Sequence, residues 1–206
     1  TIQVSGKATI KVKPTIAYIH ATVNTENKDA KTAQEENAKY INQIKKEMKN
    51  KYKLTDEDIN TNSYTVRPSY DYVEGKQIFR AYIVEHTLAI TVKDITKVGE
   101  IVDTLVASGA SSIEHIRFDI LDSDATYNLA LQKAVTNAQS KANAITTMLG
   151  VKQGKPISII EQSGSTGIIA KEMNQVAQDA GMVLGATSIE QSEIEVTAMI
   201  AVTFQY

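Results

Sequence analysis

Strict alternation of apolar and polar residues constrains the fold of this chain more than any other feature. Its clearest example is Ile194–Phe204, where every second residue is apolar. The apolar set is Ile194, Val196, Ala198, Ile200, Val202 and Phe204. A strand turns alternate side chains to opposite faces, so this spacing predicts a β-strand with one buried face.

The same period of two recurs in shorter or less regular form along the chain. It predicts strands over residues 2–12, 17–23, 59–72, 77–92, 113–121 and 156–161. The turn-type cluster at residues 73–76 joins two of these strands into a long hairpin. Pro68 within its first arm predicts an edge strand or a bulge there.

Spacings of three and four predict three helices, over residues 29–52, 95–108 and 122–149. The first carries an apolar stripe interrupted by Asn37, and the second turns five apolar residues inward, Val106 among them. In the third helix the expected buried stripe is rich in alanine, so its partner surface can approach closely. That stripe is Tyr127, Leu131, Ala134, Ala138, Ala142, Ile145 and Leu149.

The resulting order is ββα, ββα, βα, ββ, which predicts an α+β fold with a mostly antiparallel sheet and helices packed on it. We expect one domain over residues 1–206, with a flexible insertion at about 162–190 that follows a Ser/Gly-rich segment. A short amphipathic helix is expected at residues 169–180.

Three residues carry specific structural predictions. Gly6 interrupts the first strand, which predicts a bulge or a close backbone approach, and Pro14 ends that strand. Asn37 stands in an apolar helical stripe, where an amide left without hydrogen bonds costs about 1–3 kcal/mol. We therefore expect Asn37 to bind neighbouring backbone and to fix how the first helix docks.

Composition excludes several kinds of chemistry. The 206 residues include no cysteine, which removes disulfides, thiolate metal sites and cysteine nucleophiles. A net charge of -2 gives no whole-molecule attraction to nucleic acid, so we predict no nucleic-acid partner. No run of about 18 apolar residues is present, which is the length that a membrane-spanning helix needs.

The histidines and acidic residues form no recognisable catalytic or metal-binding pattern. His20, His86 and His115 all fall in predicted strands, and none belongs to an H-E-x-x-H pair. Asp119, Asp122 and Asp124 lack the glycine and glutamate of a calcium loop, and Asp122 and Asp124 fit a helix N-cap better. We predict no catalytic, cofactor or metal residues; an enzyme that uses His86 or His115 is a weakly supported alternative.

Two further segments have a structural and a functional interpretation. The glycines at 164 and 167 lack the Lys-Ser/Thr of a phosphate-binding loop, so a linker is expected there and no small-molecule ligand is assignable. Six lysines between residues 39 and 53 offer a nucleic-acid or lipid patch, but a solvated helix face explains them better.

Short motifs in a fixed order resemble those of SIMPL-domain proteins, which include periplasmic immunogenic proteins and oxidative-stress defence proteins. They begin with Val4-Ser5-Gly6-Lys7-Ala8 and Val12-Lys13-Pro14, and continue with Asp58-Ile59-Asn60-Thr61. Alanines spaced by four before Leu149-Gly150, and then Ile194-Glu195-Val196, complete the series. Thr15 and Ser192 depart from the pattern, where the family usually has an acidic residue and a glycine.

The resemblance implies an extracytoplasmic protein that assembles into closed homo-oligomeric rings, with a loose link to stress defence. We expect a signal segment, or an anchor holding the protein near a membrane, to have been removed before Thr1; trimming to a domain explains the same start. The partner is then a second copy of the chain, and no enzymatic activity is expected. A ligand- or partner-binding module built from residues 162–184 is the alternative.

Tyrosines are enriched at interfaces because they supply contact area with little entropy loss. The candidate subunit contacts are Tyr64, Tyr70 and Tyr72 of the long hairpin, with Ile194, Val196 and Phe204 of the last strand.

Overall fold

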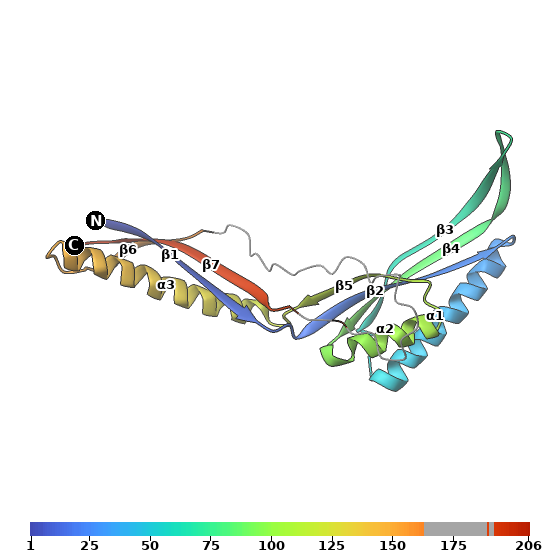
Figure 1. Ribbon diagram of the computed structural model, residues 1–206, viewed down its shortest axis with the longest axis horizontal. Helices are drawn as coiled ribbons and strands as arrows, with labels where there is room; N and C mark the ends of the chain where they lie inside the picture. The colour runs from blue at the N-terminus through green and yellow to red at the C-terminus, as the bar shows by residue number, and fades with distance from the viewer. Residues whose placement is uncertain (163–188, 190–191) are drawn as a thin grey trace. The chain divides into compact units, whose positions relative to one another are not determined.

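The computed structural model describes residues 1–162, 189 and 192–206. The elements follow the predicted order and confirm an α+β fold (Figure 1). They are β1 (Ile2–Val12), β2 (Ile16–Asn27), α1 (Ala30–Tyr52), β3 (Ile59–Val73), β4 (Lys76–Val92), η1 (Ile95–Lys97), α2 (Val98–Ala107), β5 (Ser112–Asp119), α3 (Ser123–Met148), β6 (Pro156–Glu161) and β7 (Ile194–Phe204).

The strands form two separate sheets, whereas the sequence predicted one. Their orders are β1-β7-β6 and β3-β4-β2-β5. The chain correspondingly divides into two compact units: residues 1–14, 119–162 and 192–206 form the first, and residues 15–118 with Ile189 form the second. Most of the predicted insertion at 162–190, including the helix expected at 169–180, lies outside the described residues.

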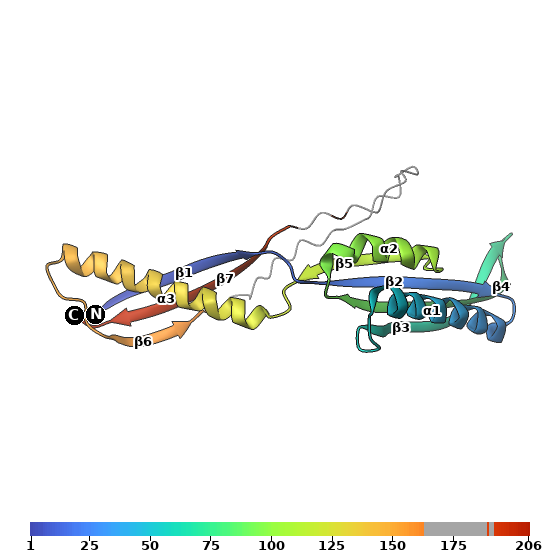
Figure 2. The same cartoon turned by 90° about the horizontal axis from the view of Figure 1, so that it is seen from below.

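The first unit is a three-stranded sheet with α3 lying across β1 and β7 (Figure 2). β1 pairs with β7 without interruption, from Ile2 opposite Phe204 to Val12 opposite Ile194. The alternating apolar residues of β7 are all buried against α3, as the sequence predicted.

The face that α3 buries is narrower than expected. Its buried residues step by four and are small: Ala130, Ala134, Ala138, Ala142 and Thr146. Ile145 and Leu149, predicted to be inside, are exposed, because α3 lies too close to the sheet for long side chains to fit between them. A Cβ at Gly6 would lie 2.0 Å from the carbonyl oxygen of Ala134. Gly6 therefore permits a close approach, as one of its two interpretations predicted, and the continuous register rules out a bulge.

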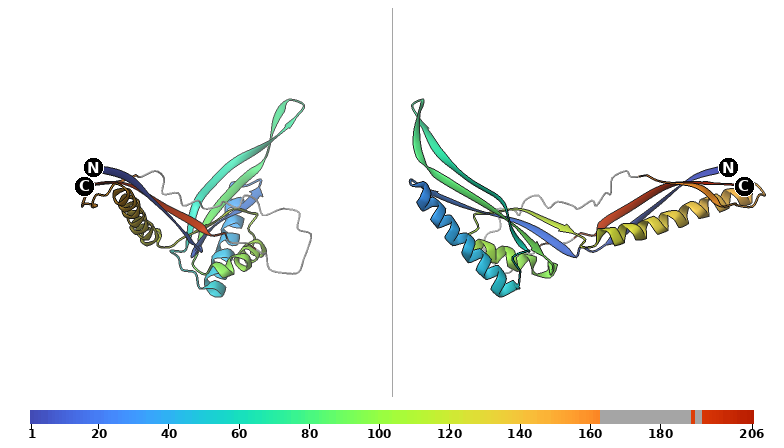
Figure 3. Two further views of the ribbon diagram at one scale, coloured as in Figure 1. Left: turned by 60° about the vertical axis from the view of Figure 1, so that its left-hand side comes forward. Right: turned by 180° about the vertical axis from the view of Figure 1, so that it is seen from behind.

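The second unit is a four-stranded sheet with α1 and α2 on one face (Figure 3). Its core joins alternate residues of β2 and β4 to the inner sides of both helices. Val106, expected to face inward, is exposed instead, because Leu105 already fills the core at that turn of α2. Pro14 is buried in the short link between β1 and β2, where the sequence predicted a strand end.

Asn37 makes the contacts that its position in the stripe predicted. Its side chain is buried, and Nδ2 donates to the carbonyl oxygens of Val23 at 3.0 Å and Val84 at 3.5 Å. These carbonyls belong to β2 and β4, so one amide ties α1 to both central strands. The Oδ1 atom is buried without a hydrogen-bond partner among the described residues.

Candidate functional site

The long hairpin extends beyond the strand that supports it. The pairing of β2 with β4 ends at Asn27 opposite Tyr82, while β3 and β4 stay paired out to Val73 opposite Lys76. We call residues 69–81 the distal hairpin. It is a two-stranded ribbon (Figure 1), and nearly all of its residues are exposed.

Local sequence explains why the ribbon forms. Glu74 and Gly75 both have positive φ values, of 50° and 77°, which is the geometry of a two-residue turn that matches strand twist. Pro68 lies on β3, which is an edge strand as predicted, so its missing N–H leaves no gap inside the sheet. A register shift between Ser69 and Tyr70 supplies the predicted bulge as well.

The distal hairpin exposes large apolar side chains on both arms. Tyr72 is 76% exposed, and Tyr70, Val73, Ile78 and Phe79 are each between 42% and 52% exposed. Aromatic rings form a short row across the ribbon: Tyr70 and Phe79 have centroids 5.9 Å apart and Phe79 and Tyr82 5.2 Å, both edge to face. This row presents rigid apolar area, which suits contact with another protein surface.

Ion pairs fix the base of the ribbon. The bulge leaves Arg80 without a direct partner in the β3–β4 register. Its guanidinium instead pairs with Glu26 at the end of β2, with Nε donating to Oε1 at 2.8 Å, and lies 3.9 Å from Asp71. The distal hairpin is thereby connected to the end of the supporting strand.

The structure separates the predicted tyrosine contacts into two groups. Tyr70 and Tyr72 belong to the distal hairpin, but Tyr64 lies against the body of the second unit. Its hydroxyl accepts a hydrogen bond from Gln34 Nε2 of α1 at 3.1 Å, and its ring meets His86 edge to face. Phe79 and Ile78 are not among the contacts predicted from the sequence, although a two-residue turn at 74–75 already places Phe79 opposite Tyr70.

The predicted contacts on the last strand need correction. β7 is the central strand of its sheet, with β1 on one edge and β6 on the other. Ile194, Val196 and Phe204 are buried in the core of the first unit. β1 occupies one hydrogen-bonding edge along the whole strand, β6 occupies the other edge only from Ile200 to Phe204, and the apolar face is covered within the chain. The three side chains therefore form core and not a side-chain contact surface.

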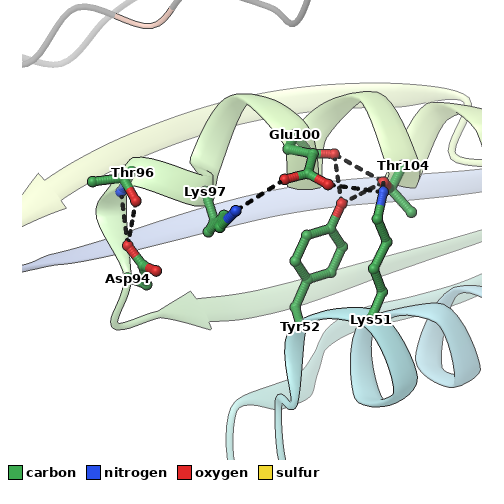
Figure 4. A network of polar contacts seen from close by, with 7 residues as sticks. All are labelled: Lys51, Tyr52, Asp94, Thr96, Lys97, Glu100 and Thr104. Carbon is green, nitrogen blue, oxygen red and sulfur yellow. Dashed lines mark hydrogen bonds and ion pairs between the residues drawn. The ribbon is translucent and has the colours of Figure 1, made fainter.

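A groove of about 440 Å³ runs between α1 and α2, lined mainly by polar side chains. The Glu100 carboxylate lies 3.0 Å from Lys51 Nζ and 3.5 Å from Lys97 Nζ (Figure 4). The Tyr52 hydroxyl lies 2.6 Å from Thr104 Oγ1 and donates to the Glu100 carbonyl oxygen at 2.9 Å.

The charged and hydroxyl groups of this network form ion pairs and hydrogen bonds with one another. Hydrogen bonding to Lys51 lowers the pKa of Glu100, so its carboxylate stays ionised and paired near neutral pH. A carboxylate held between two ammonium groups is a poor general base or nucleophile. The network therefore acts as a clasp between α1 and α2, and it offers no reactive group to the groove.

The three histidines do not meet at one site, although His20 and His115 lie near each other. His86 lies on β4, where its Nε2 is 3.0 Å from Thr61 Oγ1, and burial lowers its pKa. His20 and His115 lie on β2 and β5 with ring centroids 6.4 Å apart. Among the described residues, no three His, Asp or Glu side chains are grouped so as to hold a metal ion.

The acidic and basic segments have structural partners. Asp122 caps α3 as predicted, with Oδ1 accepting from the Ala125 N–H at 2.9 Å, and Asp119 accepts from the Ile120 N–H. In the lysine-rich part of α1, Lys49 pairs with Asp56 and Lys51 with Glu100.

The alternative binding module at residues 162–184 lies outside the described residues except for Gln162. None of the helices in the described ranges has the length and hydropathy needed to cross a membrane.

Comparison with known proteins identifies relatives along the whole chain. The family model described as "SIMPL: Protein of unknown function (DUF541)" matches residues 2–204, and so covers both units. The Escherichia coli (strain K12) protein named "Uncharacterized protein YggE" is 26% identical over 208 residues, covering 99% of this chain and 82% of the relative. The "26 kDa periplasmic immunogenic protein" of Brucella melitensis is 27% identical over 167 residues, covering 79% of this chain and 66% of the relative.

Proposed function

Because this chain belongs to the SIMPL family, we propose that it is a non-enzymatic, self-assembling protein of the cell envelope whose subunits meet through the distal hairpin. The product of assembly is a closed homo-oligomeric ring, which serves as a scaffold or binding surface. A loose link to stress defence is part of the same proposal.

The observation that carries the proposal is the exposed apolar surface of the distal hairpin. Large apolar side chains that are exposed close together often mark a contact site, and a two-stranded ribbon is marginally stable alone in water. Contact with a second copy would cover Tyr70, Tyr72 and Phe79, and would stabilise the ribbon at the same time. The clasped polar network between α1 and α2 supports a non-enzymatic role, because its charged groups are held by one another.

The name of a relative supports the extracytoplasmic location. The Brucella melitensis protein is named as periplasmic, and we extend that location to this chain as part of the proposal. With no cysteine in the sequence, any protection against oxidants runs through methionine oxidation or an indirect effect on the envelope.

Light scattering of the full chain over a wide concentration range tests the assembly. We expect a mass several times that of one chain, and a smaller mass for the double variant Tyr70→Ser/Tyr72→Ser, which changes one face of the ribbon. These two side chains are 42% and 76% exposed, so their truncation should leave the fold intact. The matched control is Val106→Ser/Leu129→Ser, which removes two exposed apolar side chains elsewhere. A monomer at high concentration, or equal masses for the two variants, would refute the proposal.

A further inference from the structure

One end of the first unit exposes a second apolar surface, separate from the distal hairpin. The chain leaves α3 at Met148 and enters β6 at Pro156, next to the start of β1 and the end of β7 (Figure 2). We call residues 148–157 the tip segment. Met148 is 87% exposed, Leu149 61% and Ile157 57%, and Val151 is exposed as well.

The tip segment holds these side chains outward on an ordered backbone. The Val151 N–H donates to the carbonyl oxygen of Thr146 at 3.0 Å, and the Gly150 N–H to that of Thr147 at 3.1 Å. Gly150 has a φ of 69°, which completes a Schellman-type helix end. Two more backbone bonds, between Gly154 and Gln205 and between Gln205 and Lys155, join the segment to the end of β7. Because the backbone is fixed in this way, the apolar side chains do not fold back onto the core.

Charge around this surface is of one sign. The tip segment contains Lys152 and Lys155 and no aspartate or glutamate. The adjoining strand ends, residues 1–6 and 196–206, also carry no acidic side chain. Lys152 and Lys155 lie within the tip segment and are exposed. A net positive, acid-free surface in a chain whose net charge is -2 is a marked local asymmetry.

We propose that the tip segment docks on an anionic lipid bilayer, with its apolar side chains at the acyl boundary and its two lysines at the headgroups. Exposed aliphatic side chains flanked by lysines are the combination that binds a membrane surface without spanning it. The long stems of lysine allow the ammonium groups to reach the phosphates while the neighbouring apolar groups are buried. The two lysines favour an anionic membrane, and not a second copy of the chain, as the partner of this surface. A second copy of this tip would bring like charges together, whereas an anionic surface attracts them.

Cosedimentation of the full chain with vesicles tests this docking. We expect binding to vesicles containing about one third phosphatidylglycerol, little binding to phosphatidylcholine alone, and weakening at high salt. Lys152→Gln/Lys155→Gln should lower the partition coefficient about thirtyfold, since each lysine near an anionic surface contributes about fivefold. Met148→Ser/Leu149→Ser should lower it about tenfold or more, through lost apolar burial.

Matched controls separate docking from general effects. Lys28→Gln/Lys46→Gln removes two exposed lysines of the second unit, and Val106→Ser/Leu129→Ser removes two exposed apolar side chains. Neither control should change vesicle binding, and thermal melting should show that all variants are folded.

Equal binding to neutral vesicles, or tip variants that bind like the controls, would overturn the proposal. A change of mass in the tip variants without vesicles would overturn it too, since it would assign the surface to contact between copies. Assembly through the distal hairpin is read by light scattering alone, so either proposal can fail without the other.

Discussion

Replacing Asn37 by aspartate should make the stability of this protein depend on pH in a way that the natural chain does not. Asn37 Nδ2 donates to the carbonyl oxygens of Val23 and Val84, and the side chain is only 1% exposed. An ionised aspartate has the same shape but no donor, and it would face two acceptors in a buried position. The protonated acid keeps one donor, so the folded state of the variant favours the neutral form.

The sign and size of the effect follow from this preference. Burial raises the pKa of such a carboxyl above its unfolded value of about 3.9, so the stability of the variant relative to the natural chain is greatest below about pH 4. As pH rises, the unfolded state ionises first, and the free energy of unfolding falls by about 1.4 kcal/mol per pH unit until the folded pKa is reached. A pKa rise of about 2–3 units, ordinary for a fully buried carboxyl, gives a loss of about 3–4 kcal/mol at neutral pH.

Urea denaturation of Asn37→Asp and the natural chain between pH 4 and 8 measures the difference. The matched control is Asn42→Asp, which makes the same change at an exposed position of the same helix. Asn37→Leu removes the donor without adding a titratable group, so its loss of about 1–3 kcal/mol should not vary with pH. If Asn37→Asp follows Asn42→Asp across the pH range, the amide does not anchor α1 and the reasoning fails.

Three further substitutions test local features by urea denaturation or melting. Gly6→Ala should lower the free energy of unfolding by about 1–3 kcal/mol or more, because the new Cβ meets backbone that cannot rotate away. The control is Gly75→Ala, where the space is open and the free energy of unfolding should fall by only about 1 kcal/mol. Equal losses for the two variants would contradict the steric argument. Hydrogen bonds from Thr55 and then Lys93 lower the pKa of Asp58, so its contribution is present above about pH 4 and is lost as pH falls through the folded pKa. Asp58→Asn should therefore be less stable by about 1.5–3 kcal/mol at neutral pH but not in strong acid, and a pH-independent loss would contradict this. Tyr52→Phe should lose about 1 kcal/mol by removing the clasp hydroxyl between α1 and α2, and an unchanged midpoint would show that the clasp contributes nothing.

Local sequence alone was enough to predict the element types and their order. The alternation in β7, the caps of α1 and α3 and the two-residue turn at Glu74-Gly75 depend on residues close together in the chain. The buried amide of Asn37 could be predicted for the same reason, because a polar residue within an apolar stripe must find a partner. Such features act within one turn or one strand, where side-chain periodicity and capping decide the geometry.

Only the tertiary structure decided which strands are neighbours and which surfaces stay open. β1 pairs with β7 across almost the whole length of the chain, so no local pattern indicates two sheets or the burial of Phe204 beside Ile2. No third strand pairs with the distal hairpin, because β2 ends at Asn27 opposite Tyr82 while β4 extends to Lys76. This difference in strand length appears only once the register is fixed. The exposure of Leu149, which was predicted to be buried, likewise appears only once α3 is packed on its sheet. Apolar residues in a sequence show what tends to be buried, but the pairing of distant strands determines which of them have anything to be buried against.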